Sequence, residues 1–149
     1  MKLKDRWLRK IDKFFLAQTV YAHCDIPCGI YSDHPAQMAA QTVVRMVEMI
    51  KALPTEGSPE EILQTRNSFV RMVMVKEEHA EICKRELLIL WTDYFKAEHL
   101  TKFPNLHETF WKAAKLCSKN KREINMEAAK QLEEAVHEIG HMFEEAKKA

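Results

Sequence analysis

A histidine and two cysteines near residue 23 have the types and spacing of a metal site. His23 and Cys24 are adjacent, and Cys28 follows four residues later, after Pro27. If the chain is cut after Ala22, the new α-amine of His23 and the amide nitrogen of Cys24 can close a five-membered ring on one metal ion. The amide nitrogen and thiolate of Cys24 close a second ring, and a turn at Pro27 returns the thiolate of Cys28 to the fourth corner. The imidazole of His23 can then bind from above this plane of two nitrogens and two sulfurs.

This donor set indicates which metal the site would hold. A planar, nitrogen-containing site suits Ni(II) or Cu(II), whereas Zn(II) prefers a tetrahedron. Thiolates and a deprotonated amide are strong electron donors, so they lower the Ni(III)/Ni(II) potential toward a range that an enzyme can use. The spacing of the two cysteines alone leaves other interpretations open, namely a disulfide, half of a zinc site or two unrelated thiols.

A second metal motif lies near the carboxyl end of the chain. His137-Glu138-x-x-His141 matches the His-Glu-x-x-His signature of zinc peptidases. On a helix the two histidines lie one turn apart and can share a zinc ion, with Glu138 as the base. This motif predicts an alternative function, a small zinc-dependent hydrolase. Only residues 142–149 follow it, which leaves little chain for a third ligand and a substrate cleft.

The elements that must position these groups are expected to be helices. Apolar residues recur at three- and four-residue steps in four segments, the first of them the stripe Ala36, Ala39, Ala40, Val43, Val47 and Ile50. Pro35 and Pro59 suit the first position of a helix, and Ser58 is expected to cap the helix that Pro59 opens. Asn105 is expected to cap the third helix, with Glu108 as its return partner, and residues 119–121 to form a loop. Four helices with short connections favour an all-α fold, an antiparallel four-helix bundle. The expected helices run from Pro35 to about Leu53, from Pro59 to about Tyr94 as one long helix or two with a bend, from Asn105 to about Ser118, and from about Ile124 to Lys147.

Length and composition agree with one folded domain. The chain has 149 residues, of which 46% are apolar and 30% charged, with only three glycines and five prolines. The net charge of +1 gives no argument for binding to nucleic acid or to a membrane surface. Apolar runs fall well short of the roughly 20 residues that span a bilayer. Cys83 and Cys117 fall within helical patterns and are expected to be buried free thiols.

The first 22 residues have the character of a leader that is removed on maturation. They contain six lysines and arginines and two aspartates, a net charge of +4. The ending Val20-Tyr21-Ala22 resembles a signal-peptidase site. The apolar stretch at residues 14–17, however, is shorter than the roughly 7–15 residues of a secretory signal. We therefore expect cleavage after Ala22 and a cytoplasmic location.

Residues 23–31 closely resemble the amino-terminal hook of nickel superoxide dismutases. Residues 35–37 follow the hook as they do in that family. Residues 90–96 match its Leu-Trp-Ser-Asp-Tyr-Phe-Lys segment except at Thr92, and residues 103–107 are similar to its Tyr-Pro-Glu-Leu-His segment. The resemblance thus covers most of the chain after the leader.

The resemblance implies an enzyme that converts superoxide to dioxygen and hydrogen peroxide by Ni(II)/Ni(III) cycling. It implies a leader at residues 1–22 and a nickel superoxide dismutase domain at residues 23–149, with the hook at 23–34 and the helical bundle at 35–149. One nickel ion per subunit, a homo-oligomer that is a hexamer, and a protease that removes the leader are also implied.

The family's ligand positions map onto residues of this hook. By resemblance, nickel binds the amine and imidazole of His23, the amide and thiolate of Cys24, and the thiolate of Cys28. Tyr31 maps to the aromatic residue of the hook that is thought to gate small anions and to position substrate or peroxide.

Two further positions concern the orientation of the axial imidazole. Some members hold it with a Glu on the first helix and an Arg on the second, and these positions fall on Gln41 and His79 here. Gln41 can still accept a hydrogen bond from the ring. A function of a different class also stays open, a non-catalytic nickel-binding or nickel-delivery protein that uses the hook without turnover.

Overall fold

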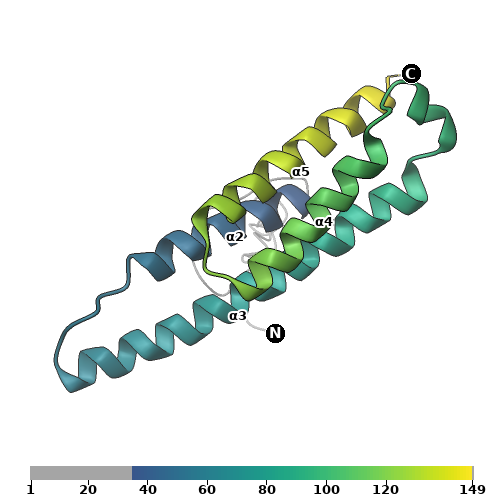
Figure 1. The fold of residues 1–149 in the computed structure, drawn as a ribbon. Coiled ribbons are helices and arrows are strands. Elements are labelled where there is room, and N and C mark those ends of the chain that lie inside the picture. Colours follow the sequence, from purple (N-terminus) through teal and green to yellow (C-terminus); the bar gives the residue numbers. More distant parts are fainter. Residues whose placement is uncertain (1–34, 149) are drawn as a thin grey trace, which may run out of the picture.

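The computed structural model describes residues 35–148, and residues 1–34 and Ala149 lie outside the described part. Within it, the chain is helical and contains no strand. The four long helices lie side by side with alternating direction, so the predicted all-α antiparallel bundle is confirmed (Figure 1). The elements are α2 (Pro35–Lys51), α3 (Pro59–Ile89), the π-helical segment η1 (Leu90–Tyr94), the 3-10 segment η2 (Ala97–Thr101), α4 (Leu106–Arg122) and α5 (Met126–Ala146).

The start of α3 follows from three residues of local sequence. Ser58 lies at the N-cap, and its side-chain oxygen accepts a hydrogen bond from the backbone N–H of Glu61 at 3.3 Å. The carboxylate of Glu61 accepts in return from the backbone N–H of Ser58 at 2.8 Å. The hydrogen bond from the backbone N–H of Ser58, and then one from its hydroxyl, lower the pKa of the Glu61 carboxyl. With Pro59 opening the helix, the predicted start is confirmed.

The end of α3 settles the choice between one long helix and two. The α-helix runs unbroken to Ile89 and then widens into the π-helical turn of η1. Phe95 is extended, with φ −73° and ψ 137°, and ends the helical run. The chain then reverses through η2 before α4 begins.

Two expectations for α4 are wrong. Asn105 makes no side-chain capping bond, and its amide instead donates to the hydroxyl of Thr109 at 3.3 Å. Glu108 does not return to the cap because its carboxylate pairs with Lys112, one turn further on, at 2.6 Å. The predicted loop at residues 119–121 is the last turn of α4, which continues to Arg122.

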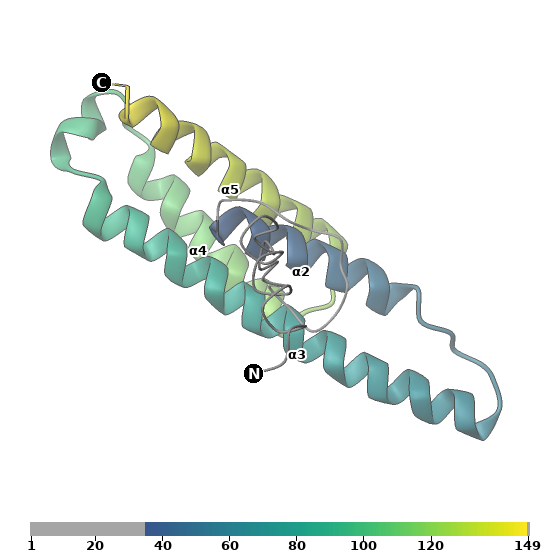
Figure 2. The same cartoon turned by 180° about the vertical axis from the view of Figure 1, so that it is seen from behind.

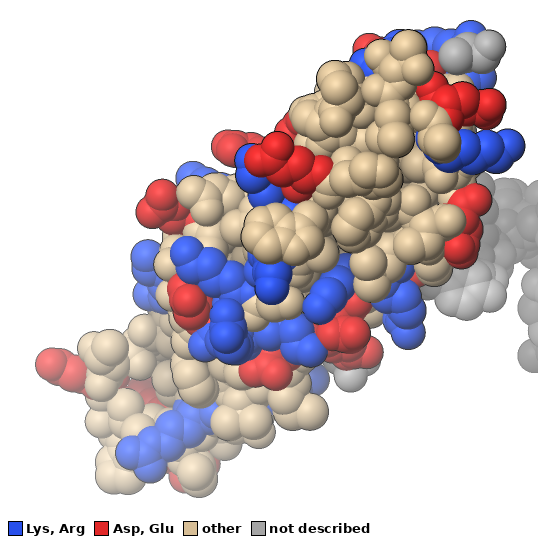
Figure 3. Space-filling model, turned by 45° about the vertical axis from the view of Figure 1, so that its right-hand side comes forward, with Lys and Arg blue, Asp and Glu red and all other residues tan. Residues whose placement is uncertain are grey.

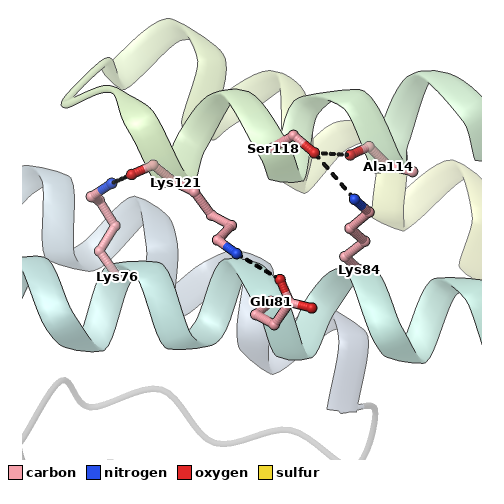
Figure 4. Close-up of polar contacts among 6 residues, drawn as sticks. All are labelled: Lys76, Glu81, Lys84, Ala114, Ser118 and Lys121. Carbon is pink, nitrogen blue, oxygen red and sulfur yellow. Dashed lines mark hydrogen bonds and ion pairs between the residues drawn. The ribbon is translucent and has the colours of Figure 1, made fainter.

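A buried lysine explains why α4 continues. Lys76 on α3 is 1% exposed, and its ammonium donates to the carbonyls of Lys121 and Glu123, each at 3.1 Å, and to that of Asn120. These carbonyls belong to the end of α4 and its link to α5, and a helix end leaves such groups without partners in its own helix. Burial lowers the pKa of Lys76, and the neighbouring Glu77 opposes that shift. Figure 4 shows Lys76 reaching from α3 to Lys121 on α4.

Asn120 extends this joint to α5. Its side-chain amide donates to the carbonyls of Leu116, at 3.0 Å, and Ala128, at 2.9 Å. The side chain of Asn125 caps α5 by accepting from the backbone N–H of Ala128 at 3.1 Å. Three helices are thus fixed to one another by polar groups that are distant in sequence.

The core lies between the four helices. Every residue of the apolar stripe expected on α2 is buried, as are Cys83 and Cys117, which are free thiols as predicted. The pKa of Cys83 is raised, first by a hydrogen bond with the Cys117 thiol and then by burial. The core also includes Leu87, Leu106, Phe110, Ala113, Leu132, Val136 and Ile139.

One part of the bundle is only two helices thick. The end of α2, the following loop and the first half of α3 extend beyond α4 and α5 in both views (Figures 1 and 2). We call this part, residues 44–75, the tip. Met46 and Val47 of α2 are buried there, but several large apolar side chains of α3 are exposed, with Leu63 58% and Met74 66% accessible to solvent. Phe69 and Val70 are exposed as well.

The charged surface is mixed in sign. On the face shown in Figure 3, lysines and arginines alternate with acidic groups across the middle of the bundle, and the area above them carries few charges. Exposed ion pairs, such as Lys121 with Glu81 at 2.7 Å, join side chains of opposite charge on the protein surface. None of the described helices combines the length and apolar character that crossing a bilayer requires.

Candidate metal centre

The predicted nickel ligands His23, Cys24 and Cys28, and the hook aromatic Tyr31, lie outside the described residues. The structure does describe the base to which the hook is attached. Pro35, the first described residue, opens α2 directly after the hook. The site can therefore be built up to this point from the helices that surround the start of α2.

Three helices form a cavity at the start of α2. Its volume is about 220 Å³, and its walls come from the first turn of α2, the end of α3 and the second half of α5. Gly140 on α5 allows this approach, because a Cβ atom there would lie 2.9 Å from the side-chain nitrogen of Gln37. The lining residues are Pro35, Ala36, Gln37, Glu86, Leu87, Ile89, Leu90, Val136, Ile139, Gly140 and Phe143.

An aromatic group continues the wall of this cavity at η1. The ring of Tyr94 meets that of Phe143, which lines the cavity, edge-on with centroids 4.6 Å apart. It also contacts Phe95, at 5.2 Å, and stacks on His99, at 5.9 Å. Tyr94 thus places a half-buried phenol beside the cavity. Helical periodicity alone gave no sign of this, because the phenol is brought there by the wider turn of η1.

The two short segments that resemble the family pack on each other. Trp91 donates from its indole nitrogen to Nδ1 of His107 at 2.8 Å. Its ring also stacks on Phe110, with centroids 5.8 Å apart and planes 10° from parallel. Residues 90–96 and 103–107 therefore form one structural unit that closes the end of the bundle near the cavity.

The two positions expected to orient the axial imidazole lie on adjacent helices. His79 on α3 is 3% exposed, and its Nδ1 lies 2.8 Å from the carbonyl of Val75. A ring nitrogen this close to a carbonyl oxygen donates to it. Gln41 on α2 is half-buried, and within residues 35–148 its side chain makes no hydrogen bond. A link from either residue to His23 stays a prediction.

The His-Glu-x-x-His motif does not form a hydrolase site in the described part of the chain. His137 and His141 are both exposed on α5, and neither lines the cavity at α2 or the polar groove between α4 and α5. Glu138 lines that groove instead. Among residues 35–148, no group of three His, Cys, Asp or Glu side chains is placed to hold a metal ion. The zinc hydrolase alternative is therefore not supported.

Comparison with known proteins gives one consistent result. Residues 18–147 match the family model described as nickel-containing superoxide dismutase. The superoxide dismutase [Ni] of Streptomyces coelicolor is 33% identical over 131 residues, which cover 88% of this chain and 92% of that protein. The corresponding protein of Streptomyces seoulensis is 32% identical, over 87% of this chain and 92% of that protein.

Solved structures agree with the sequence matches. A nickel-containing superoxide dismutase with nickel ligation corresponding to the oxidised state superposes with a TM-score of 0.67 and 31% identity. The match covers 85% of this chain and all of that one. A native nickel superoxide dismutase structure gives a TM-score of 0.66 and 30% identity over the same shares.

The fold and these matches define a helical, metal-dependent oxidoreductase that acts on superoxide. More specifically, the chain belongs to the nickel-containing superoxide dismutase family. Its activity is the conversion of superoxide to dioxygen and hydrogen peroxide, and its cofactor is nickel.

Proposed function

We propose that residues 23–34 hold the nickel ion of this dismutase, one ion per subunit, through His23, Cys24 and Cys28. The observation that carries this assignment is that the family match begins at residue 18 and so includes the hook. The donor chemistry also fits, because two thiolates, an amide nitrogen and an amine form a planar set that suits Ni(II). His23 would add its imidazole to this ligand set.

The residues of the hook have different roles in the reaction. Nickel held there would supply one-electron chemistry between Ni(III) and Ni(II): one superoxide is oxidised to dioxygen, and the next takes up one electron and two protons to give hydrogen peroxide. The thiolates of Cys24 and Cys28 bring the potential into range by donating electron density. By resemblance to the family, the role of Tyr31 is to gate small anions, with its hydroxyl orienting superoxide or peroxide.

Maturation is part of this function. While Ala22 is attached, the nitrogen of His23 is an amide and a poor neutral donor, so residues 1–22 keep the site incomplete. A protease that cuts after Ala22 creates the amine and frees the hook in one step. The mature domain is then residues 23–149, with residues 35–149 as the bundle.

Three forms of the chain test the assignment, beginning at Met1, Ala22 and His23. Each is loaded with nickel under reducing conditions, and superoxide consumption is measured. Only the form beginning at His23 is expected to be active, since one extra residue displaces the amine from its five-membered ring. Comparable activity in the form beginning at Ala22 would show that the terminal amine is not a required ligand.

We propose further that the active protein is a homo-oligomer, a hexamer by resemblance to the family. The exposed apolar side chains of the tip support an interface there, because residues 63, 70 and 74 recur at helical spacing on one side of α3. Light scattering at micromolar concentration tests this proposal, and a monomer mass would contradict it. A cytoplasmic location is proposed from the short apolar stretch of the leader.

A further inference from the structure

The histidine pair on α5 is left without a role by the dismutase reaction. His137 and His141 lie in the continuous helix Met126–Ala146, and both side chains are exposed. Residues four apart on a helix are neighbours, with Cβ atoms about 6 Å apart. Val136 and Ile139 are buried on the opposite side, which fixes the rotation of α5 and keeps both imidazoles on its outer surface.

The surroundings of the pair favour a cation. Within the described residues, neither imidazole has a hydrogen-bond or ion-pair partner. Glu134 is exposed one turn before His137. Glu145 lies one turn after His141 and makes only an exposed ion pair with Lys102, at 3.4 Å. Two neutral ring nitrogens and nearby negative charge are therefore available to an ion from solvent.

We propose that His137 and His141 form a second binding site, a solvent-exposed chelate for a divalent transition-metal ion such as Ni²⁺. Imidazole nitrogen suits nickel, copper and zinc. A helix holds the two rings in place before the ion arrives, so little ordering is needed on binding. Since no third side-chain ligand is placed nearby in residues 35–148, water completes the coordination. The ion is then held more weakly than in the hook and exchanges with solvent.

The position of this chelate links it to the nickel centre. The same turn of α5 contacts the start of α2, because Gly140 lies against the side chain of Gln37 and lines one cavity with Pro35. Pro35 follows the hook directly, and His23 is only twelve residues before it. An exchangeable ion on α5 is thus held on a turn that lies against the start of α2, the helix that follows the hook in the sequence. The chelate itself does not depend on the assignment of ligands in the hook.

The test removes the thiolates of the hook so that only the second site is measured. The 149-residue chain carrying Cys24→Ser and Cys28→Ser is titrated with Ni²⁺ by calorimetry and passed over immobilised Ni²⁺. We expect weak binding of one ion and retention on the column. Adding His137→Ala or His141→Ala, singly, is expected to abolish both, because a chelate needs both rings.

His107→Ala in the same background is the matched control, since His107 is an exposed histidine without a second one a turn away. It is expected to leave the titration unchanged. Circular dichroism checks that each variant keeps its helices. Nickel binding that persists unchanged in both α5 variants, or that is absent from the parent, overturns the proposal. Neither result bears on whether His23, Cys24 and Cys28 hold the catalytic ion.

Discussion

The two halves of α3 differ in what covers them, although one uninterrupted helix contains both. From Lys76 onward, its inward side chains are closed in by α2, α4 and α5, and Leu87 is 1% exposed. Before Lys76, α2 is the only helix of residues 35–148 that reaches it, and Leu63 is 58% exposed. The apolar pattern of the sequence runs through both halves. Burial is therefore decided by how far the neighbouring helices extend, and the tip is left with a surface available to another subunit.

The largest effect is expected from substitutions in the hook, which should remove activity without changing the stability of the bundle. Cys24→Ser or Cys28→Ser is expected to abolish superoxide consumption, because a neutral hydroxyl is a poor donor to nickel. Neither half of the bundle should change, so circular dichroism and thermal unfolding are expected to match the parent. Full activity in both variants would remove these residues from the ligand set.

Within the bundle, the largest loss is expected where three helices are joined. Lys76→Met removes the donor to one buried and two part-buried carbonyls and is expected to lower the free energy of unfolding by about 3 kcal/mol, since each buried polar group left unpaired costs about 1–3 kcal/mol. Urea unfolding measures the change. The control Lys112→Met removes an exposed ion pair with Glu108 and is expected to cost less than about 1 kcal/mol. Equal losses would mean that the carbonyls find other partners.

A pair of leucines on the same helix tests the difference between its halves directly. Leu87→Ala in the covered half is expected to cost about 2–5 kcal/mol, because it leaves a cavity in the core. Leu63→Ala in the tip is expected to cost no more than about 0.5 kcal/mol in the isolated subunit. If the tip forms the proposed subunit interface, Leu63→Ala should instead raise the dissociation constant of the oligomer, which analytical ultracentrifugation measures. If Leu63→Ala destabilised the isolated subunit as much as Leu87→Ala does, the contrast between the two halves would be lost.

The smallest expected effect is on the stability of the protein at acidic pH. Glu61, at the start of the tip, and Glu81, in the covered half, both have a pKa below the ordinary value of 4.5, owing first to hydrogen bonds from Ser58 and Lys121 respectively. A carboxyl whose pKa is lowered by folding contributes stability above pH 4.5 that is lost as the pH falls through its folded pKa. In the Glu61→Gln and Glu81→Gln variants, stability should therefore fall slightly less steeply as the pH is lowered. Thermal unfolding between pH 2 and 6 measures it, and a steeper loss in either variant would contradict the assignment.

Local sequence predicted the elements whose causes are local. The Ser58 cap, the proline at the start of α3 and the apolar stripe of α2 are set by residues within one or two turns. The end of α4 was not predicted, because the group that satisfies its carbonyls comes from Lys76, 44 residues earlier than Asn120. The capping pattern at Asn105 failed because Glu108 has a closer partner in Lys112.

The candidate site also contains residues that the sequence predicts and contacts that it does not. Chelate chemistry and resemblance identify His23, Cys24 and Cys28 without knowledge of the fold, since the ligands lie within six residues of one another. Contacts between residues on different helices could not be predicted in this way, because only the folded bundle brings those residues together. Tyr94 beside Phe143, and Gly140 against Gln37, are of this kind.

The joint at Lys76 has a consequence for how the protein responds to its medium. Proteins also use rings of backbone carbonyls to strip water from a potassium ion. In this protein the ammonium of Lys76 takes the place of such an ion. Because the ammonium is part of the side chain, the carbonyls cannot lose it by dilution. Dissolved salt weakens exposed pairs such as Lys121 with Glu81, but it cannot compete for a place that a buried side chain already fills. The three-helix joint should therefore behave alike in fresh and in saline surroundings.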